Sequence, residues 1–369
     1  MTMRPTKLLF DHQAFLEQQY GGVSRYICEV ATRLSMSERF SVVVAAGLHV
    51  NELLQPDQLR VIGKKIRPVK RTASLRAYFN RTLESALIQA WRPNIVHETY
   101  YRRWDRGAAQ AKVVVTMHDF IHERHSMFFD ADPTVARRKV AMDRADALVC
   151  VSHATRQYLC DLYPQHAAKS TVIQHGQNYS EPSRQALAAI DKFTGGRPFL
   201  LYVGSRFGYK NFPMFVNAFA ASLAPDESAV LVCFGGGEFD ATELAQMREA
   251  GLAQEQCLQL SGSDDLLHAT YKRAATFAYP SLEEGFGIPL LEARAAGCPV
   301  ACSRIPVFEE VLQADAFYFD PRSVDGMADA LQLAFNAGGN VGTRTPAPIQ
   351  RFSWQRSADL HGRLYASLA

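Results

Sequence analysis

The chain has 369 residues, 47% of them hydrophobic and 21% charged, and a formal net charge of +3. This composition is that of a folded globular protein and excludes a largely disordered chain, and the small net charge argues against a nucleic-acid-binding protein. Since a single core seldom exceeds roughly 100 to 200 residues, the length predicts two domains with a ligand cleft between them.

Short apolar runs alternate with helical patterns through the first half of the chain. Strands are predicted at residues 8–10, 42–45, 94–97, 113–116 and 147–151. Apolar residues with helical spacing, from Val23 to Leu34, predict a helix there. Two more helix starts are indicated by Asp132, which stands before Pro133, and by Ser152.

The second half repeats this alternation. Strands are predicted at residues 199–203, 230–234, 258–260, 276–279 and 300–302. Asn211, just ahead of Pro213, indicates a further helix start. Because short buried strands separated by helices form parallel sheets, we expect an α/β protein with two doubly wound, Rossmann-like domains.

The domain boundaries follow from the same alternation. Residues 1–178 are expected to form the first domain and residues 198–351 the second. Residues 179–197 are expected to be a linker, because Ser, Pro, Gly and charged residues replace the apolar pattern there. Residues 352–369 are expected to be a helix that packs across a domain through one apolar face, formed by Leu360, Leu364 and Leu368.

Positive charge is concentrated in residues 60–81. This segment contains eight basic residues and no acidic one: Arg60, Lys64, Lys65, Arg67, Lys70, Arg71, Arg76 and Arg81. Such a segment can contact an anionic membrane surface or a phosphorylated acceptor, and it can equally be a solvated loop and helix face. Both interpretations stay open at this point.

The amino terminus and the cysteines indicate the compartment. Residues 1–7 lead into a short apolar run and then polar residues, unlike a signal peptide, and no apolar run reaches the roughly 20 residues that span a bilayer. Seven cysteines form no C-x-x-C pair, and Cys150 and Cys233 lie in apolar strand-like runs, so we expect free buried thiols. A cytoplasmic protein that does not cross a membrane is therefore expected.

A turn broken by Gly285 and Gly287 runs from a predicted strand into a predicted helix, with Glu284 before it and Glu292 after it. Glycines let the backbone approach a ligand closely, and the amides at a helix start attract an anion. The alternative is a plain tight turn whose acidic residues favour the positive end of the helix dipole. That alternative explains Glu292, but not Glu284, which precedes the glycines.

The loop after the predicted strand at 199–203 carries two cations. Gly204 and Ser205 lead into Arg206, and Lys210 follows four residues later. Both cations could close on one diphosphate, because a guanidinium forks across two oxygens and an ammonium acts as a point charge. As an alternative, both are ordinary surface cations. Their position at the carboxyl end of a strand, where open α/β sheets bind ligands, favours the site.

These two motifs resemble the donor site of the retaining family 4 glycosyltransferases, which have the GT-B fold. The resemblance is carried by Gly-Ser-Arg-x-x-x-Lys-Asn at 204–211 and Glu-Gly-Phe-Gly-x-Pro-x-x-Glu at 284–292. It extends over most of the chain, through Gly21-Gly22, Thr116 to Asp119, Ala296 to Val300 and Phe352 to Trp354. Residues 10–13 and 20–26 resemble the branch of mannosyltransferases in O-polysaccharide assembly.

The resemblance implies a fold of two facing domains with a central cleft, crossed by the carboxyl-terminal helix, and roles for the donor-site residues. Arg206 and Lys210 would hold the diphosphate, Glu284 the hydroxyls of the donor sugar, and Glu292 those of the ribose. The glycines at 204, 285 and 287 with Ser205 and the amides of Phe286 to Ile288 would complete the anion site.

The remaining implied roles are spread over both halves. Gly21 and Gly22 would let the first domain close over the phosphates, and His118 would face the sugar near the reacting carbon. Ser263 and Leu266 would lie near the nucleoside base. Each has an alternative, because Ser263 can cap a helix and a histidine at a strand end can bond neighbouring backbone.

No metal or cofactor is expected. Asp130-Ala131-Asp132 resembles the Asp-x-Asp of metal-dependent glycosyltransferases, but Asp132 before Pro133 is better explained as a helix cap. Arg206 and Lys210 supply positive charge without a metal ion.

The sequence therefore predicts a retaining, metal-independent hexosyltransferase. The resemblance implies front-face substitution, with mannose from GDP-mannose as the leading donor and a bacterial polysaccharide, lipopolysaccharide or lipid-linked oligosaccharide as the acceptor. The expected location is the cytoplasm, and contact of residues 60–81 with the inner face of the cytoplasmic membrane is one of the two interpretations of that segment. Two alternatives are an epimerase of the same architecture and a non-catalytic protein that binds sugar nucleotides.

Overall fold

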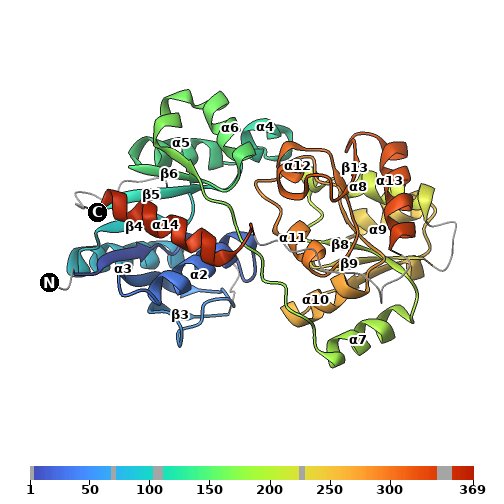
Figure 1. Ribbon diagram of the computed structural model, residues 1–369, viewed down its shortest axis with the longest axis horizontal. Helices are drawn as coiled ribbons and strands as arrows, with labels where there is room; N and C mark the ends of the chain where they lie inside the picture. The colour runs from blue at the N-terminus through green and yellow to red at the C-terminus, as the bar shows by residue number, and fades with distance from the viewer. Residues whose placement is uncertain (1–3, 68–71, 103–110, 224–228, 339–350) are drawn as a thin grey trace. The chain divides into compact units, whose positions relative to one another are not determined.

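The structure is a computed structural model and describes residues 4–67, 72–102, 111–223, 229–338 and 351–369. It divides into two compact units, shown with their helices and strands in Figure 1. Unit 1 comprises residues 1–176 and 351–369, and unit 2 comprises residues 177–350. Each contains one sheet of parallel strands, as the sequence predicts for an α/β protein.

Unit 1 is built on a seven-stranded sheet within the described residues, in the order β3-β2-β1-β4-β5-β6-β7. Its strands are β1 (Thr6–Phe10), β2 (Phe40–His49), β3 (Val61–Lys65), β4 (Ile95–Glu98), β5 (Lys112–Met117), β6 (Ala147–Cys150) and β7 (Ser170–Val172). Its helices are α1 (Gln13–Glu17), α2 (Gly22–Ser35), α3 (Ala73–Trp91), α4 (Ile121–Arg124), α5 (Thr134–Arg144), α6 (His153–Leu162) and α14 (Trp354–Leu368).

In the described part of unit 2, six strands form one sheet in the order β10-β9-β8-β11-β12-β13. Its strands are β8 (Phe199–Val203), β9 (Val230–Phe234), β10 (Cys257–Leu260), β11 (Thr276–Tyr279), β12 (Val300–Ser303) and β13 (Phe317–Phe319). Its helices are α7 (Arg184–Thr194), α8 (Phe212–Ser222), α9 (Ala241–Glu249), α10 (Asp264–Arg273), α11 (Ile288–Ala295), α12 (Pro306–Leu312) and α13 (Val324–Ala337).

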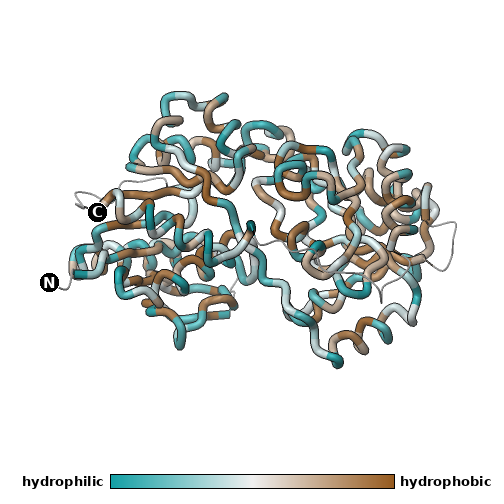
Figure 2. The backbone as a smooth tube through the Cα atoms, viewed as in Figure 1, coloured by the Kyte–Doolittle hydropathy of each residue, from teal (hydrophilic) through white to brown (hydrophobic). Residues whose placement is uncertain are grey.

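The central strands are continuous apolar runs, because helices cover both faces of a parallel sheet and bury most side chains of these strands. In unit 1, β1 lies between β2 and β4, so that Phe10 pairs in register with Val44 on one side and His97 on the other. In unit 2, β8 holds the same position between β9 and β11. The interior strand segments are correspondingly hydrophobic (Figure 2). The edge strand β3 was not predicted, because only two of its five residues are apolar.

Three predicted helix starts have different outcomes. Ser152 caps α6 as predicted, since its side chain accepts a hydrogen bond from the amide of Thr155. Asp132 does not occupy the capping position of α5, which is that of Pro133, although its side chain accepts from the amide of Thr134, the first residue of the helix. The helix start predicted at Asn211 is confirmed, since α8 begins at Phe212, but the Asn211 side chain does not cap the helix. Asn211 precedes the helix in a left-handed conformation, and its amide group donates to the carbonyls of Pro280 and Pro321 instead.

The segment predicted as a linker contains helix α7. Ser183 caps this helix by accepting from the amide of Ala186, and Asp265 of α10 accepts from both the amide and the hydroxyl of Ser183. Only small or isolated residues of α7 are buried, namely Ala186, Ile190 and Thr194. Ala186, Leu187, Ile190 and Phe193 recur with helical spacing, and the segment was predicted as a linker because Ser, Pro and Gly residues flank it.

The carboxyl-terminal helix α14 belongs to unit 1 and contacts α2. The prediction of its packed face was wrong, because the three leucines are only half-buried. The residues that it buries are mostly polar or aromatic: Trp354, Ser357, Ala358, His361, Gly362 and Tyr365. A Cβ at Gly362 would lie 3.2 Å from the ring of Phe40, so a glycine allows this close approach.

A chain of hydrogen bonds fixes α14 to the sheet. His361 Nδ1 lies 2.8 Å from the carbonyl of Ser357 and must donate to it, which leaves His361 Nε2 to accept from the Tyr26 hydroxyl at 2.6 Å. The Tyr26 oxygen then accepts from the hydroxyl of Thr116 at 3.0 Å. His361 must therefore be a neutral imidazole, in which Nδ1 donates and Nε2 accepts.

The same chain continues to the other end of α14. Thr116 accepts from His97 Nε2 at 2.8 Å, and His97 Nδ1 accepts from the hydroxyl of Tyr365 at 2.5 Å. Every donor in this series of hydrogen bonds therefore has an acceptor only while His97 and His361 are neutral. Burial lowers the pKa of His361 to about 4 and the pKa of His97 and His175 well below the ordinary histidine value.

All seven cysteines are free, as predicted, and six of them are buried. Among the described residues we find no helix that is both long and apolar enough to span a membrane.

The stability of unit 1 is expected to fall as the pH decreases from 6.5 towards 4. In this window the unfolded chain binds protons on His361 that the folded state excludes, so stability is fully present above the unfolded pKa and is lost below it. The pKa difference corresponds to at most about 3 kcal/mol for His361. Denaturant titrations across this pH range measure the slope, which His361→Gln should flatten. His153→Gln, at an exposed histidine, is the matched control; equal slopes for the two variants would contradict the assignment.

Candidate functional site

The chain reverses direction at the centre of both sheets. From β1 it proceeds outward to β2 and β3 and then crosses back to β4, and from β8 it proceeds to β9 and β10 and then crosses back to β11. The carboxyl ends of the two strands on either side of such a switch point bind ligands in open α/β sheets. The loops that follow β8 and β11 carry the two predicted donor motifs, at 204–211 and 284–292.

In the loop after β8, the Arg206 side chain is bound by protein groups. Its Nε donates to Glu243 Oε1 at 2.6 Å, and its Nη atoms donate to the carbonyls of residues 235–238 at 3.0 to 3.3 Å. The Arg206 side chain is only 3% exposed. The glycines at 235–237 all have positive φ, which lets their carbonyls converge on one guanidinium.

Lys210 takes a different direction. Its Nζ lies 2.5 Å from Glu284 Oε1, which also accepts from the hydroxyl of Ser281 at 2.7 Å. The ammonium lies 5.1 and 5.4 Å from the ring centroids of Tyr209 and Tyr279. The structure thus brings Lys210 and Glu284 together, from loops that follow the neighbouring strands β8 and β11, and gives Arg206 and Lys210 separate partners.

The turn between Glu284 and Glu292 is closely packed. Gly287 precedes α11 with φ +103°, and a Cβ there would lie 3.0 Å from Leu290 and 3.3 Å from Phe308. A side chain at this position would be strained by both conformation and space. Glu292 is buried on α11, where its Oε2 accepts from the hydroxyl of Tyr271 at 3.4 Å.

The remaining predicted residues of unit 2 lie in the segments that follow β8, β10 and β11. Gly204 has φ +116°, a conformation that favours glycine, and Ser205 is exposed beside it. Gly285, Phe286 and Ile288 are buried in the turn before and at the start of α11. Ser263 caps α10 by accepting from the amide of Leu266 at 3.4 Å, which is the structural alternative considered for this pair.

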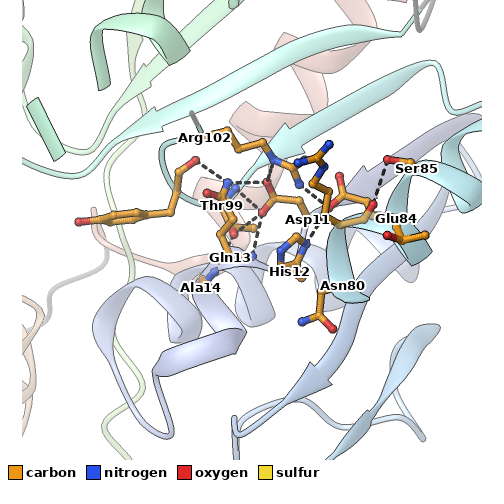
Figure 3. A network of polar contacts seen from close by, with 12 residues as sticks. Asp11, His12, Gln13, Ala14, Asn80, Glu84, Ser85, Thr99 and Arg102 are labelled. Atoms are coloured by element: carbon orange, nitrogen blue, oxygen red, sulfur yellow. Dashed lines mark hydrogen bonds and ion pairs between the residues drawn. The ribbon is translucent and has the colours of Figure 1, made fainter. Parts of the chain in front are cut away.

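In unit 1, a buried charged cluster joins the loops after β1 and β4 (Figure 3). Asp11 is fully buried and accepts from the amide and hydroxyl of Thr99 at 3.0 and 2.5 Å, from the Gln13 amide group at 2.7 Å and from Arg102 Nε at 3.0 Å. Glu84 of α3 forms an ion pair with Arg102 and a hydrogen bond of 2.8 Å with His12 Nδ1. The ends of β1 and β4 are thereby held in fixed positions by five buried residues: Asp11, His12, Glu84, Thr99 and Arg102.

His118 follows β5 and is oriented by this cluster. Its Nε2 lies 3.1 Å from the carbonyl of Thr99, the residue that Asp11 holds, so Nε2 carries the proton and Nδ1 is left as an acceptor. The amide of His118 donates to the hydroxyl of Tyr101. Burial lowers the pKa of His118 to about 4, so this imidazole is neutral at physiological pH.

Gly21 and Gly22 lie at the start of α2, where Gly21 precedes the helix and Gly22 is its first residue. A Cβ at Gly21 would lie 2.5 Å from Gln18 Oε1, and this oxygen also accepts from the amide of Ser24. A larger residue would displace Gln18 from the first turn of the helix.

Sequence reasoning assigned no role to Asp11, Glu84, Arg102 and Glu243, although Asp11 lies in a stretch quoted for its resemblance. Glu84 and Glu243 lie on helices far along the chain from their partners, at separations of 18 and 37 residues from Arg102 and Arg206. No local pattern marks such pairs. The described residues contain no group of three or more His, Cys, Asp or Glu side chains placed to hold a metal ion.

The two halves of the chain match different family models. Residues 20–181 match the model described as Glycosyltransferase Family 4, and residues 183–340 match Glycosyl transferases group 1.

The names of two curated relatives describe them as O-antigen chain mannosyltransferases. O-antigen chain mannosyltransferase B of Escherichia coli is 30% identical over 227 residues, which cover 58% of this chain and 59% of the relative. O-antigen chain mannosyltransferase RfbU of Salmonella typhimurium is 28% identical over 183 residues, 50% of this chain and 49% of the relative. The matches therefore span only about half of these relatives.

Among solved structures, HepE of Anabaena in complex with UDP and glucose has a TM-score of 0.73 at 18% identity. The match covers 98% of this chain and all of that one. At this identity the similarity establishes the GT-B fold, as the sequence predicts.

The Arg206→Ala variant is expected to unfold more readily than the wild type. Removing a buried guanidinium leaves Glu243 and the carbonyls of 235–238 without their donor, at a cost of about 3 kcal/mol. Lys210→Ala should cost less, because Lys210 is 14% exposed and Glu284 keeps the hydrogen bond from Ser281. Chemical denaturation of both variants measures the difference. If Arg206→Ala were as stable as the wild type, the guanidinium would have no structural role.

Proposed function

The two halves of the chain belong to the glycosyltransferase families that match them, Glycosyltransferase Family 4 and Glycosyl transferases group 1, and we propose that the protein transfers a hexose from a sugar nucleotide to a glycan acceptor. The observation that carries this proposal is the Lys210–Glu284 pair at the switch point of unit 2. A cation for a diphosphate and a carboxylate for sugar hydroxyls lie there within 2.5 Å of each other.

The pair is suited to bind both ends of a sugar diphosphate. An ammonium stabilises the negative charge that grows on the departing diphosphate, and a carboxylate accepts hydrogen bonds from sugar hydroxyls. On donor binding, Lys210 would exchange part of its contact with Glu284 for phosphate oxygens. Arg206 would act mainly by holding the 235–238 turn in place, in contrast to the expectation that it clamps the diphosphate beside Lys210.

We further propose transfer with retention by front-face substitution. In this step the acceptor oxygen forms a bond to the anomeric carbon, the bond from that carbon to the diphosphate breaks, and the acceptor proton moves to a diphosphate oxygen. Lys210 and Glu284 position the donor, and neither is needed as a nucleophile. Neutral His118, with Nδ1 as an acceptor, would orient a sugar hydroxyl.

Mannose from GDP-mannose is the proposed donor, and a bacterial polysaccharide, lipopolysaccharide or lipid-linked oligosaccharide is the proposed acceptor. The names of the E. coli and Salmonella relatives support mannose, while the base is supported only by the sequence resemblance. HepE is bound to UDP in its structure, so uridine nucleotides are the main competitor. A cytoplasmic location at the inner membrane surface completes the proposal, with residues 60–81 as its expected contact.

Release of nucleoside diphosphate should identify the donor. The protein is incubated with GDP-mannose, UDP-glucose and ADP-glucose, with and without a lipid-linked oligosaccharide extract, and GDP release should be fastest with GDP-mannose. Lys210→Ala and Glu284→Gln should lower turnover by roughly a hundredfold or more, as for the loss of charge stabilisation at a leaving group. Lys272→Ala, at an exposed ion pair, is the matched control. Wild-type turnover in both site variants would refute the assignment.

Turnover is expected to survive chelation. Since Lys210 supplies positive charge at the leaving group, excess EDTA should leave the rate within about twofold of the untreated protein. Loss of activity in EDTA, with recovery on adding manganese, would overturn the proposal of metal-independent transfer.

A further inference from the structure

The loop after β8 and the segment after β11 are bonded to each other on both sides of Ser281. The amide of Leu282 donates to the carbonyl of Tyr209 at 2.8 Å. The side chain of Asn211 donates to the carbonyl of Pro280 at 3.2 Å. Ser281 is fully buried between these two bonds. Its backbone is therefore fixed by hydrogen bonds that involve neither charged side chain of the site.

The hydroxyl of Ser281 is aimed at Glu284. It donates to Oε1 at 2.7 Å, and the ammonium of Lys210 lies 2.5 Å from the same oxygen. A carboxylate oxygen has more than one lone pair, so it accepts both hydrogen bonds together. Because both contacts use Oε1, they leave Oε2 for a hydroxyl of the donor sugar.

A second hydroxyl, that of Tyr279, lies beside the same pair. Tyr279 is the last residue of β11 and is only 4% exposed, and its ring stacks on Phe308 of α12 with 5.0 Å between the ring centroids. Its oxygen accepts from Lys210 Nζ at 3.5 Å. Burial raises the pKa of Tyr279 well above the ordinary tyrosine value, and the charge of Glu284 and a hydrogen bond to that carboxylate raise it further. Tyr279 thus keeps its proton and donates a hydrogen bond to Glu284.

The fold holds the two hydroxyls more firmly than it holds the ammonium. The hydroxyls lie on side chains that are fixed by a bonded turn and by ring stacking, whereas the ammonium of Lys210 ends a flexible four-carbon chain. The Lys210 side chain is also 14% exposed, while Ser281 is fully buried. A diphosphate would therefore draw away the ammonium and leave both hydroxyls in place.

We infer that Ser281 and Tyr279 are positioning residues, whose hydroxyls hold Glu284 towards the donor sugar when Lys210 turns to the diphosphate. This inference rests on the proposed function, because it names the groups that orient the sugar ligand of the same site. The ligand that they serve is a hexose linked to a diphosphate. They act through Glu284 and need no contact with the reacting atoms.

The charges of these groups explain why two hydroxyls suit this role. An ammonium that lies on a carboxylate offsets its negative charge and competes with sugar hydroxyls for its oxygens. Neutral hydroxyls hold the carboxylate without cancelling its charge. Glu284 is only 11% exposed, and a buried carboxylate that lost every donor would be strongly destabilised. Departure of Lys210 therefore leaves Glu284 oriented and fully charged, so that binding of the diphosphate and binding of the sugar favour each other.

Ligand titrations separate the orientation of Glu284 from general support of the turn. The full chain is titrated by calorimetry with GDP and GDP-mannose, and with UDP and UDP-glucose. The variant Ser281→Ala/Tyr279→Phe removes only two oxygen atoms. Its Kd for the diphosphate should stay within about twofold of the wild type, whereas its Kd for the sugar nucleotide should rise roughly tenfold, as for lost hydrogen bonds to a charged group. Lys210→Ala should instead weaken both ligands, because it removes the diphosphate contact that they share.

Tyr163→Phe and Ser222→Ala are the matched controls. The Tyr163 hydroxyl also donates to a carboxylate, that of Glu123 in unit 1, and the Ser222 hydroxyl donates to a backbone carbonyl of α8. Both variants should bind every ligand as the wild type does. Circular dichroism and the thermal midpoint check that each variant is folded. Equal weakening of the diphosphate and the sugar nucleotide by the folded double variant would overturn the inference, and so would unchanged affinity for both.

A double-mutant cycle tests the hold on Glu284 without any donor. The denaturation midpoint is measured for Lys210→Ala, Ser281→Ala and the combined variant. Ser281→Ala should lower the midpoint more in the Lys210→Ala background than in the wild type, because the hydroxyl then holds the carboxylate without the ammonium. Additive effects would overturn the inference whatever ligand the protein binds. If the cycle shows coupling but the wild type binds no sugar nucleotide, the proposed function fails and the hold on Glu284 stands.

Discussion

The reversal of chain direction at the centre of each parallel sheet is the constraint on which the rest of the structure depends. It brings the ends of β1 and β4, and of β8 and β11, to the same edge of their sheets. Loops that are far apart in sequence then meet in space, such as those holding Lys210 and Glu284, 74 residues apart. A side chain at a strand end gains a ligand-binding position from this topology alone.

Burial of charge in a low-dielectric interior decides how these loops are held. Asp11, Glu84 and Arg102 in unit 1, and Arg206 with Glu243 in unit 2, are removed from water and must be saturated by partners. Such groups contribute little net stability but permit only one arrangement, because any displacement leaves a buried charge uncompensated. The candidate site is therefore rigid where it is charged and buried, and Lys210, at 14% exposed, is more accessible than Arg206, at 3%.

The same principle explains the carboxyl-terminal helix. Tyr26, Thr116, His97, His361 and Tyr365 form one directional series of hydrogen bonds that requires neutral imidazoles. Helix α14 is joined to unit 1 through this polar series and close packing at Gly362, and its leucines contribute less. The unit thereby acquires a sensitivity to acid that its overall composition does not suggest.

The sequence by itself determined the central strands, both glycine turns and the placement of Lys210 and Glu284 after two strands and of Glu292 on a helix, because apolar runs, glycine spacing and capping residues are local properties of the chain. It could not determine the partners of Arg206, the tautomer of His118 or the packed face of α14. Those depend on groups such as Glu243, Thr99 and Tyr26, which only folding brings within hydrogen-bonding distance. The inward face of α3 was likewise decided by tertiary structure, since Asn80 and Glu84 bond a backbone group and a buried charge that only folding brings to them.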